Sequence, residues 1–121
     1  RTCDDGSMSS AEPTPPPVRQ ISAVELKAML DRHEPFEFVD VRTPDERELA
    51  CISGSRLLDQ AYGDHILSLE RDTPLVFQCH HGIRSQSAAE YCIRQGFTNV
   101  CNLVGGIDAW SLTVDPTVPR Y

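Results

Sequence analysis

The sequence predicts an α/β domain in which helices cover both faces of a parallel sheet. Short apolar runs, such as residues 74–78, alternate along the chain with stretches of helical periodicity. Helix start signals follow two of these runs directly. With 121 residues, of which 40% are hydrophobic, the chain is long enough for one core. A regular alternation of strand and helix favours parallel strands joined by crossover helices.

Local signals place the elements of the first half of the chain. Ser22 and Glu25 have the spacing of a capping box, which predicts a helix that runs to about Arg32. Thr43 and Glu46 repeat this spacing with a proline at the first helical position, so a short helix should end near residue 50 or 51. Strands are expected at residues 18–21, 36–41 and 55–58.

The second half continues the alternation. A turn at Pro74 starts a short buried strand that ends at Gln78. Small or apolar residues at helical spacing from Ser85 to Ile93 indicate a helix, which Gly96 stops. The remaining expected elements are a helix at residues 62–71, a strand at 99–103 and a short helix around 107–110.

The domain is expected to span residues 18–121. Residues 1–17 are rich in Ser, Asp, Thr and Pro, which predicts a disordered tail or a linker. Gly6 and Ser7 directly before Met8 are either a cloning scar or part of an interdomain linker, and the sequence leaves both open.

Charge and cysteine content restrict the partners. Eleven Lys and Arg residues against eighteen Asp and Glu give a net charge of −7, which argues against binding to nucleic acid or to an anionic membrane. The apolar runs are too short to cross a bilayer. Five cysteines without regular pairing suit a reducing compartment, so we expect a cytoplasmic location. Two adjacent histidines are too few to indicate a metal site.

The loop from Cys79 to Ser85 carries most of the functional information. Cys79 stands at the carboxyl end of a strand, where N–H groups of the loop and of the following helix favour negative charge. We expect a thiol there to have a pKa below about 8.5, to be open to solvent and to be faced by amide nitrogens. A lone cysteine is more often a packing residue, but Gly82 and Arg84 in the same loop favour a nucleophile.

The run Cys-x-x-Gly-x-Arg-Ser resembles the active-site loop of the rhodanese family of sulfurtransferases. It is similar to the single-domain type, which also occurs fused behind monothiol glutaredoxins. Cysteine-dependent phosphatases with a related loop have one residue more between the cysteine and the arginine, whereas four separate Cys79 from Arg84. Three further stretches extend the resemblance over about residues 18–112: Asp40-Val41-Arg42 with Glu46, Ile52-Ser53-Gly54-Ser55, and Gly105-Gly106-Ile107-Asp108-Ala109-Trp110.

The resemblance implies a rhodanese-like fold, a five-stranded parallel sheet in the order 1-5-4-2-3 with helices on both sides. It implies transfer of a sulfane sulfur from a small anionic donor, such as thiosulfate, through a persulfide on Cys79. The acceptor would be cyanide in vitro and a thiol or a protein in the cell. No cofactor is implied. Asp40 and Arg42 would support the site, and the donor-binding loop would comprise His80, His81, Gly82, Ile83, Arg84 and Ser85.

Individual roles follow from residue type. We expect Gly82 to let the loop turn inward, Arg84 to tie the loop or to be a plain surface cation, and Ser85 to cap the following helix. His80 and His81 should face the entrance. The other expected roles are structural: an Arg42–Glu46 ion pair, a turn fixed by Asp40, and packing of Cys92, Cys101 and Trp110.

Two departures from the family pattern leave questions open. His80 and His81 stand where the two-domain thiosulfate enzymes carry Arg and Lys, so the natural donor stays open. Cys51 replaces a histidine found in many members, and is a candidate second thiol that resolves a Cys79 persulfide. A non-catalytic or persulfide-carrier binding module remains an alternative. A cysteine-dependent phosphatase or arsenate reductase is another, which the short loop disfavours.

Overall fold

The computed structural model describes residues 17–121, in which five strands form one parallel sheet. Their order, β1-β5-β4-β2-β3, confirms the order that the rhodanese resemblance implied. Strand β4 lies at the centre between β5 and β2, so a residue just past its end has loops on both sides. The strands are β1 (Arg19–Ile21), β2 (Glu37–Asp40), β3 (Arg56–Leu57), β4 (Leu75–Gln78) and β5 (Val100–Leu103).

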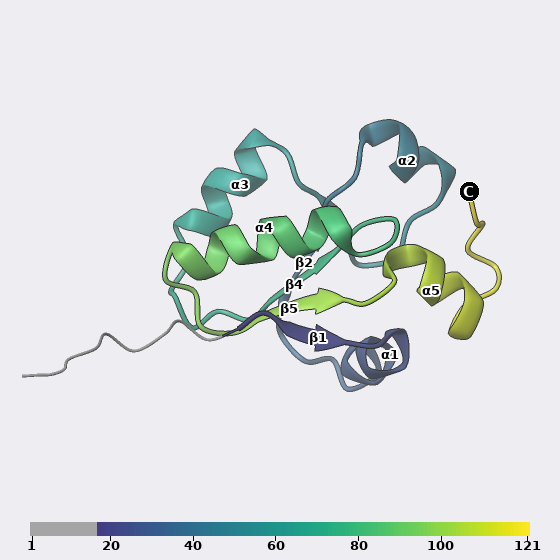
Figure 1. Ribbon diagram of the computed structural model, residues 1–121, viewed down its shortest axis with the longest axis horizontal. Coiled ribbons are helices and arrows are strands. Elements are labelled where there is room, and N and C mark those ends of the chain that lie inside the picture. Colours follow the sequence, from purple (N-terminus) through teal and green to yellow (C-terminus); the bar gives the residue numbers. More distant parts are fainter. Residues whose placement is uncertain (1–16) are drawn as a thin grey trace, which may run out of the picture.

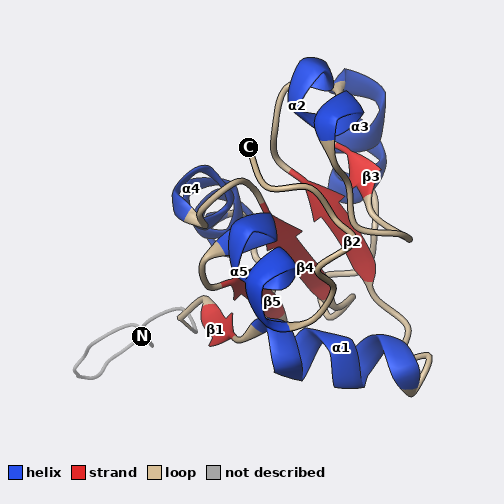
Figure 2. Ribbon diagram, turned by 90° about the vertical axis from the view of Figure 1, so that its right-hand side faces the viewer, coloured by secondary structure: helices blue, strands red, loops and turns tan. Residues whose placement is uncertain are grey.

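Helices cover both faces of the sheet (Figures 1 and 2). The first core packs α1 and α5 against one face, and includes Leu26 and Trp110. The second packs α3 and α4 against the other, and includes Tyr62 and Ala89. The described helices are all too short or too polar to cross a lipid bilayer. They are α1 (Ala23–Asp31), α2 (Pro44–Leu49), α3 (Gln60–Leu67), α4 (Ile83–Arg94) and α5 (Gly106–Thr113).

Both predicted capping boxes are present. The Ser22 hydroxyl accepts the N–H of Glu25 at 3.0 Å, and the Glu25 carboxylate accepts the N–H of Ser22 at 2.9 Å. Thr43 and Glu46 make the same reciprocal pair at the start of α2, with Pro44 in its first turn. These local bonds satisfy N–H groups that a helix start would otherwise leave unpaired.

Helix α3 differs from its predicted range of residues 62–71. The Asp59 carboxylate accepts the N–H of Tyr62 at 2.8 Å, so the helix begins at Gln60. It ends at Leu67, because the N–H of Ser68 bonds back to the carbonyl of His65. Asp59 is an ordinary N-cap residue, and the sequence prediction missed it. Helix α5 is longer than expected and continues to residue 113.

A buried ion pair follows β2. Two guanidinium nitrogens of Arg42 donate to the two carboxylate oxygens of Asp40 at 2.7 and 2.8 Å, and both side chains are fully buried. Arg47 donates to the same carboxylate at 2.8 Å, and Arg42 also donates to the carbonyl of Ala50 at 2.8 Å. Asp40 therefore fastens α2 to the end of the sheet, which is more than the turn that we expected it to fix.

The expected ion pair between Arg42 and Glu46 is wrong. Arg42 reaches only the backbone carbonyl of Glu46, at 3.3 Å. Its charge is compensated by Asp40, two residues earlier, because the strand end brings both side chains to the same buried place.

The predicted tail of residues 1–17, its linker or scar interpretation included, lies outside the described residues except for Pro17. The core built by residues 17–121 does not test that prediction.

Replacement of Asp40 by asparagine should destabilise the fold strongly. Asp40→Asn leaves Arg42 buried without a countercharge, which costs about 3 kcal/mol of the free energy of unfolding. The measurement is equilibrium unfolding in urea. Asp31→Asn is the matched control, since it removes an exposed pair with Lys27 and should cost less than about 1 kcal/mol. Equal losses in the two variants would contradict the assigned role of Asp40.

Candidate active site

The loop between β4 and α4 lies at the carboxyl edge of the sheet. Strand β4 ends at Gln78 and α4 begins at Ile83, so Cys79 to Gly82 form the connection. Gly82 has a φ of +98°, a left-handed conformation that glycine adopts at little cost. A Cβ at this position would lie 3.1 Å from the carbonyl oxygen of Leu103 and 3.3 Å from the amide nitrogen of Gly105. The expected inward turn at Gly82 is therefore present, and a larger residue has little room there.

Backbone amides face the sulfur of Cys79, as we expected. The N–H of Gly82 donates to Sγ at 3.1 Å and the N–H of Ser85 donates to it at 3.4 Å. Ser85 occupies the third position of α4, whose N-cap residue, Gly82, makes no side-chain cap. The sulfur of Cys79 thus acts as the N-terminal cap of α4. The expectation that Ser85 caps the helix is wrong, because its hydroxyl points to Asn102 and to the sulfur instead.

These donors stabilise the thiolate. Burial raises the pKa of the Cys79 thiol. Hydrogen bonds from the Ser85 hydroxyl and from the N–H groups of Ser85, Gly82 and His81 lower this pKa, and together they outweigh burial. The net result is a pKa below the ordinary value of a cysteine. A lowered pKa means that the thiolate persists to a lower pH than in an exposed cysteine, so a larger fraction is nucleophilic near neutrality.

Helix α5 decides which side of the loop faces the sulfur. The N–H of Ile107 donates to the carbonyl of Cys79 at 2.8 Å, and the N–H of Asp108 donates to the carbonyl of His80 at 3.2 Å. Gly106 makes this approach possible, because a Cβ there would overlap the carbonyl oxygen of Cys79. With the His80 carbonyl turned to α5, the N–H of His81 in the same peptide unit points the other way, toward the sulfur, where it lowers the thiol pKa. The sequence analysis included Gly106 only as part of a family motif and did not predict its contact with the loop.

Asn102 was also missed. It is the one polar residue of strand β5, whose other residues are apolar, and like them it is buried. Its amide oxygen accepts the Ser85 hydroxyl at 2.6 Å, and its amide nitrogen donates to the carbonyl of Gly82 at 3.1 Å. The single hydroxyl hydrogen of Ser85 serves either Asn102 or the sulfur, which lies 3.3 Å away. Asn102 therefore binds both Gly82 and Ser85, the two residues whose N–H groups donate to the sulfur.

Arg84 binds α2 rather than pointing into the loop. Its guanidinium donates to both carboxylate oxygens of Glu46, at 2.6 and 2.9 Å. The same guanidinium holds the pKa of Glu46 well below its usual range. This pair joins residues 38 positions apart, so Arg84 ties the loop to α2 and is more than a plain surface cation.

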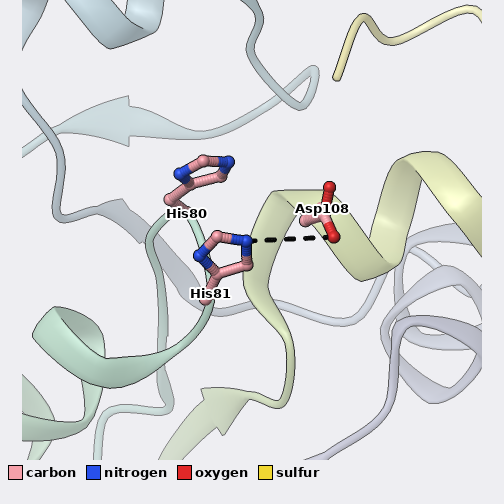
Figure 3. Close-up of side chains that lie close together, drawn as sticks. All are labelled: His80, His81 and Asp108. Atoms are coloured by element: carbon pink, nitrogen blue, oxygen red, sulfur yellow. Dashed lines mark ion pairs between the residues drawn. The ribbon is translucent and has the colours of Figure 1, made fainter. Parts of the chain in front are cut away.

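The two histidines lie at the outer side of the loop. Their rings stack with centroids 3.9 Å apart, and Nε2 of His81 lies 3.9 Å from the carboxylate of Asp108 (Figure 3). Nitrogen and oxygen atoms of these three side chains lie within 4.8 Å of one another. Arg120 already binds the Asp108 carboxylate at 2.8 Å, so the cluster has an ionic partner of its own. That the protein needs no metal stays a prediction.

The expectation that Cys79 is open to solvent is wrong for this structure. Only 1% of the residue is exposed. A hollow of about 450 Å³ lies beside the loop and is lined by His81, Gly82, Asn102 and Gly105, among others, but not by Cys79. The N–H donors therefore contact a sulfur that is closed off from solvent. A reactant can reach this sulfur only when the site opens.

The other expected residues are placed more simply. Asp40 and Arg42 do not contact the sulfur, and support the site through α2. Burial raises the pKa of Cys92 to about 11 and raises that of Cys101, which fits packing residues. Trp110 is buried as predicted. Cys51 is exposed, and its role as a second thiol stays a prediction.

Comparison with known proteins identifies the family that this loop belongs to. The family model described as a rhodanese-like domain matches residues 22–113. The chain belongs to the rhodanese family. The match includes the loop, the strand before it and the α5 start that binds its carbonyls.

Curated relatives within this family are named as thiosulfate sulfurtransferases. GlpE of Pseudomonas paraeruginosa is 45% identical over 80 residues, which cover 65% of this chain and 73% of the relative. GlpE of Pseudoalteromonas translucida is 34% identical over 103 residues, which cover 84% and 97%. A solved rhodanese-like domain protein from Staphylococcus aureus superposes with a TM-score of 0.68 at 28% identity, covering 86% of this chain and 99% of that one.

A side chain at Gly106 should disturb the rhodanese loop. Gly106→Ala places a methyl group against the carbonyl of Cys79, so the loop must move. Its N–H groups then no longer point to the sulfur. We expect the ratio of the Cys79 alkylation rate by iodoacetamide at neutral pH to that at alkaline pH to fall by at least about fivefold, because the thiol pKa rises and the ratio cancels any difference in access. Peptide mass spectrometry measures both rates.

Gly54→Ala is the matched control for backbone strain. Gly54 also has a positive φ, +92°, but a Cβ there meets nothing within 4 Å. If both variants show the same ratio of neutral to alkaline alkylation rates at Cys79, the contact of α5 with the loop does not orient the site.

Proposed function

We propose that this protein is a sulfurtransferase that moves a sulfane sulfur from a small anionic donor, such as thiosulfate, to a thiophilic acceptor. The observation that carries the proposal is the set of N–H donors on the Cys79 sulfur, those of Gly82 and Ser85. Such donors stabilise a thiolate before the reaction and a persulfide anion after it. The names of the curated relatives support thiosulfate as the donor.

The first step is attack by the Cys79 thiolate on the outer sulfur of thiosulfate. A new S–S bond forms at Cys79, the S–S bond of thiosulfate breaks, and sulfite leaves with the bonding electron pair. The negative charge then rests on the terminal sulfur of the persulfide. The N–H groups of Gly82 and Ser85, which bind Sγ of Cys79 before the reaction, are the groups that would stabilise this charge.

The second step returns the enzyme to its starting state. A nucleophilic acceptor attacks the terminal sulfur, and the Cys79 thiolate leaves with the electron pair of the S–S bond. Cyanide would give thiocyanate in vitro, and a thiolate would give an acceptor persulfide in the cell. A thiolate with a lowered pKa is the better leaving group, so the same amides assist both steps.

The residues of the loop have different roles in this reaction. Gly82 and Ser85 bind the sulfur, and Ile83 and Arg84 connect them along the first turn of α4. His80 and His81 lie on the outer side, where a donor or an acceptor would first contact the loop. The whole molecule carries a charge of −7, so attraction of a small anion depends on these local groups.

Thiosulfate should transfer one sulfur atom to Cys79. Intact-mass spectrometry after incubation with thiosulfate is expected to show the addition of a single sulfur, which cyanide then removes as thiocyanate. Cys79→Ser should abolish both results. Cys51→Ser is the matched control, since it removes an exposed thiol and should leave the addition unchanged.

The same experiment tests the alternatives. Addition of sulfur to Cys51 in place of Cys79 would contradict the proposed nucleophile. A folded protein that takes up no sulfur from any sulfane donor would favour the non-catalytic binding module, and turnover of an aryl phosphate or of arsenate would favour the phosphatase or reductase.

A further inference from the structure

The segment after α5 crosses the outer side of the active-site loop. In Figure 1 it runs past α5 and ends beside α2. The Tyr121 ring stacks on the His80 ring, with centroids 3.9 Å apart and planes 11° from parallel. Its hydroxyl accepts from Arg42 at 3.0 Å and donates to Glu46 at 2.8 Å. Three elements therefore hold one phenol: the loop, the end of β2 and α2.

These contacts place Tyr121 across the loop from one end to the other. His80 directly follows the nucleophile at the start of the loop. Arg84 closes the loop at its other end and is bound to Glu46, the residue that accepts the Tyr121 hydroxyl. The phenol thus contacts the beginning of the loop with its ring and the anchor of the loop's end with its hydroxyl.

The neighbouring residue fastens the same segment. Arg120 donates to the Asp108 carboxylate at 2.8 Å, and Asp108 lies in the first turn of α5, whose N–H groups bind the loop carbonyls. The segment is consequently held at two places, by Arg120 on α5 and by Tyr121 on His80 and Glu46. The nucleophile, of which only 1% is exposed, lies in the loop against which this segment packs.

Release of Tyr121 would leave no buried charge without a partner. The residue is already 37% exposed, so only part of its surface must be uncovered when it moves away. Arg42 keeps its two bonds to Asp40, and Glu46 keeps its two bonds to Arg84. The closed position depends on two hydrogen bonds and one aromatic stack, interactions that break and re-form without disturbing the core.

We propose that Tyr121 controls access to Cys79: it closes the mouth of the loop by stacking on His80, and reactants reach the sulfur when it moves away. The proposal concerns access to the thiol; that the reactants admitted are a sulfane donor and an acceptor rests on the proposed function. In the closed state the same residue would shield a persulfide from unrelated thiols. Since the reactive state is the open one, the observed rate is the intrinsic rate multiplied by the open fraction.

The test is the alkylation rate of Cys79 by iodoacetamide, followed by peptide mass spectrometry. It is run at an alkaline pH where the thiol is ionised in every variant, so that access and not the pKa decides the rate. Exposed Cys51 provides an internal reference in the same sample, and buried Cys92 and Cys101 report any general loosening.

Two variants at Tyr121 separate its contributions. Tyr121→Ala removes the stack and both hydrogen bonds, and should speed alkylation of Cys79 relative to Cys51 by about fivefold or more. Tyr121→Phe keeps the stack and loses the hydroxyl, so its rate should fall between those of the wild type and the alanine variant. Tyr91→Ala removes an exposed tyrosine on α4 and should have no effect.

The outcome for the access role is distinct from the outcome for the proposed function. If Tyr121→Ala changes the relative rate at Cys79 no more than Tyr91→Ala does, the access role is wrong, whatever the sulfur chemistry shows. Faster alkylation without any persulfide formation would support the access role and count against the proposed function. With both correct, kcat/KM for thiosulfate rises in Tyr121→Ala by the same factor as alkylation.

Discussion

The orientation of two carbonyl groups determines what this site can do. The carbonyls of Cys79 and His80 are bound by N–H groups in the first turn of α5, so the N–H of His81, in the same peptide unit as the His80 carbonyl, points to the sulfur. The loop is thereby held where Gly82 and Ser85 also donate to the sulfur. The reverse orientation would turn a carbonyl oxygen toward the sulfur in place of an N–H group and disfavour a thiolate. The sheet order makes the arrangement possible, because β5, the strand before α5, lies next to β4, the strand before the loop. Fold and chemistry are connected at Gly106, where a side chain has no room.

Hydrogen-bond donors, more than arginine charges, stabilise the anion at Cys79. Each arginine near the loop has a carboxylate partner of its own: Arg42 has Asp40, Arg84 has Glu46 and Arg120 has Asp108. Their charges are largely neutralised before a substrate arrives, and the chain as a whole is acidic. Directed N–H groups in a buried site act at short range with no countercharge to displace, which suits one sulfur atom that gains and loses negative charge.

Local signals in the sequence were enough to predict much of this structure, but they did not predict the long-range contacts. The capping boxes at Ser22 and Thr43 and the strand that leads to Cys79 depend on neighbouring residues, so the sequence displays them directly. The partner of Arg42, the buried position of Asn102 and the stack of Tyr121 on His80 depend on which elements meet in the fold. The sequence order of the residues carries no such information. The burial of Cys79 likewise depends on the folded structure, in which Glu46 of α2 and Tyr121 pack against residues of its loop. The start of α3 was missed for a different reason, because the cap at Asp59 is local and was overlooked.

The central claim is that the loop amides stabilise a thiolate at Cys79, and its pKa in the folded protein tests this most directly. Titration of the thiolate absorbance in the far ultraviolet, taken as the difference between the wild type and Cys79→Ser, isolates this one group. The account predicts a midpoint below the ordinary cysteine value of about 8.5, because the N–H and O–H donors outweigh burial. A midpoint at or above that value would mean that burial prevails and that the loop does not activate the sulfur, which would contradict the account.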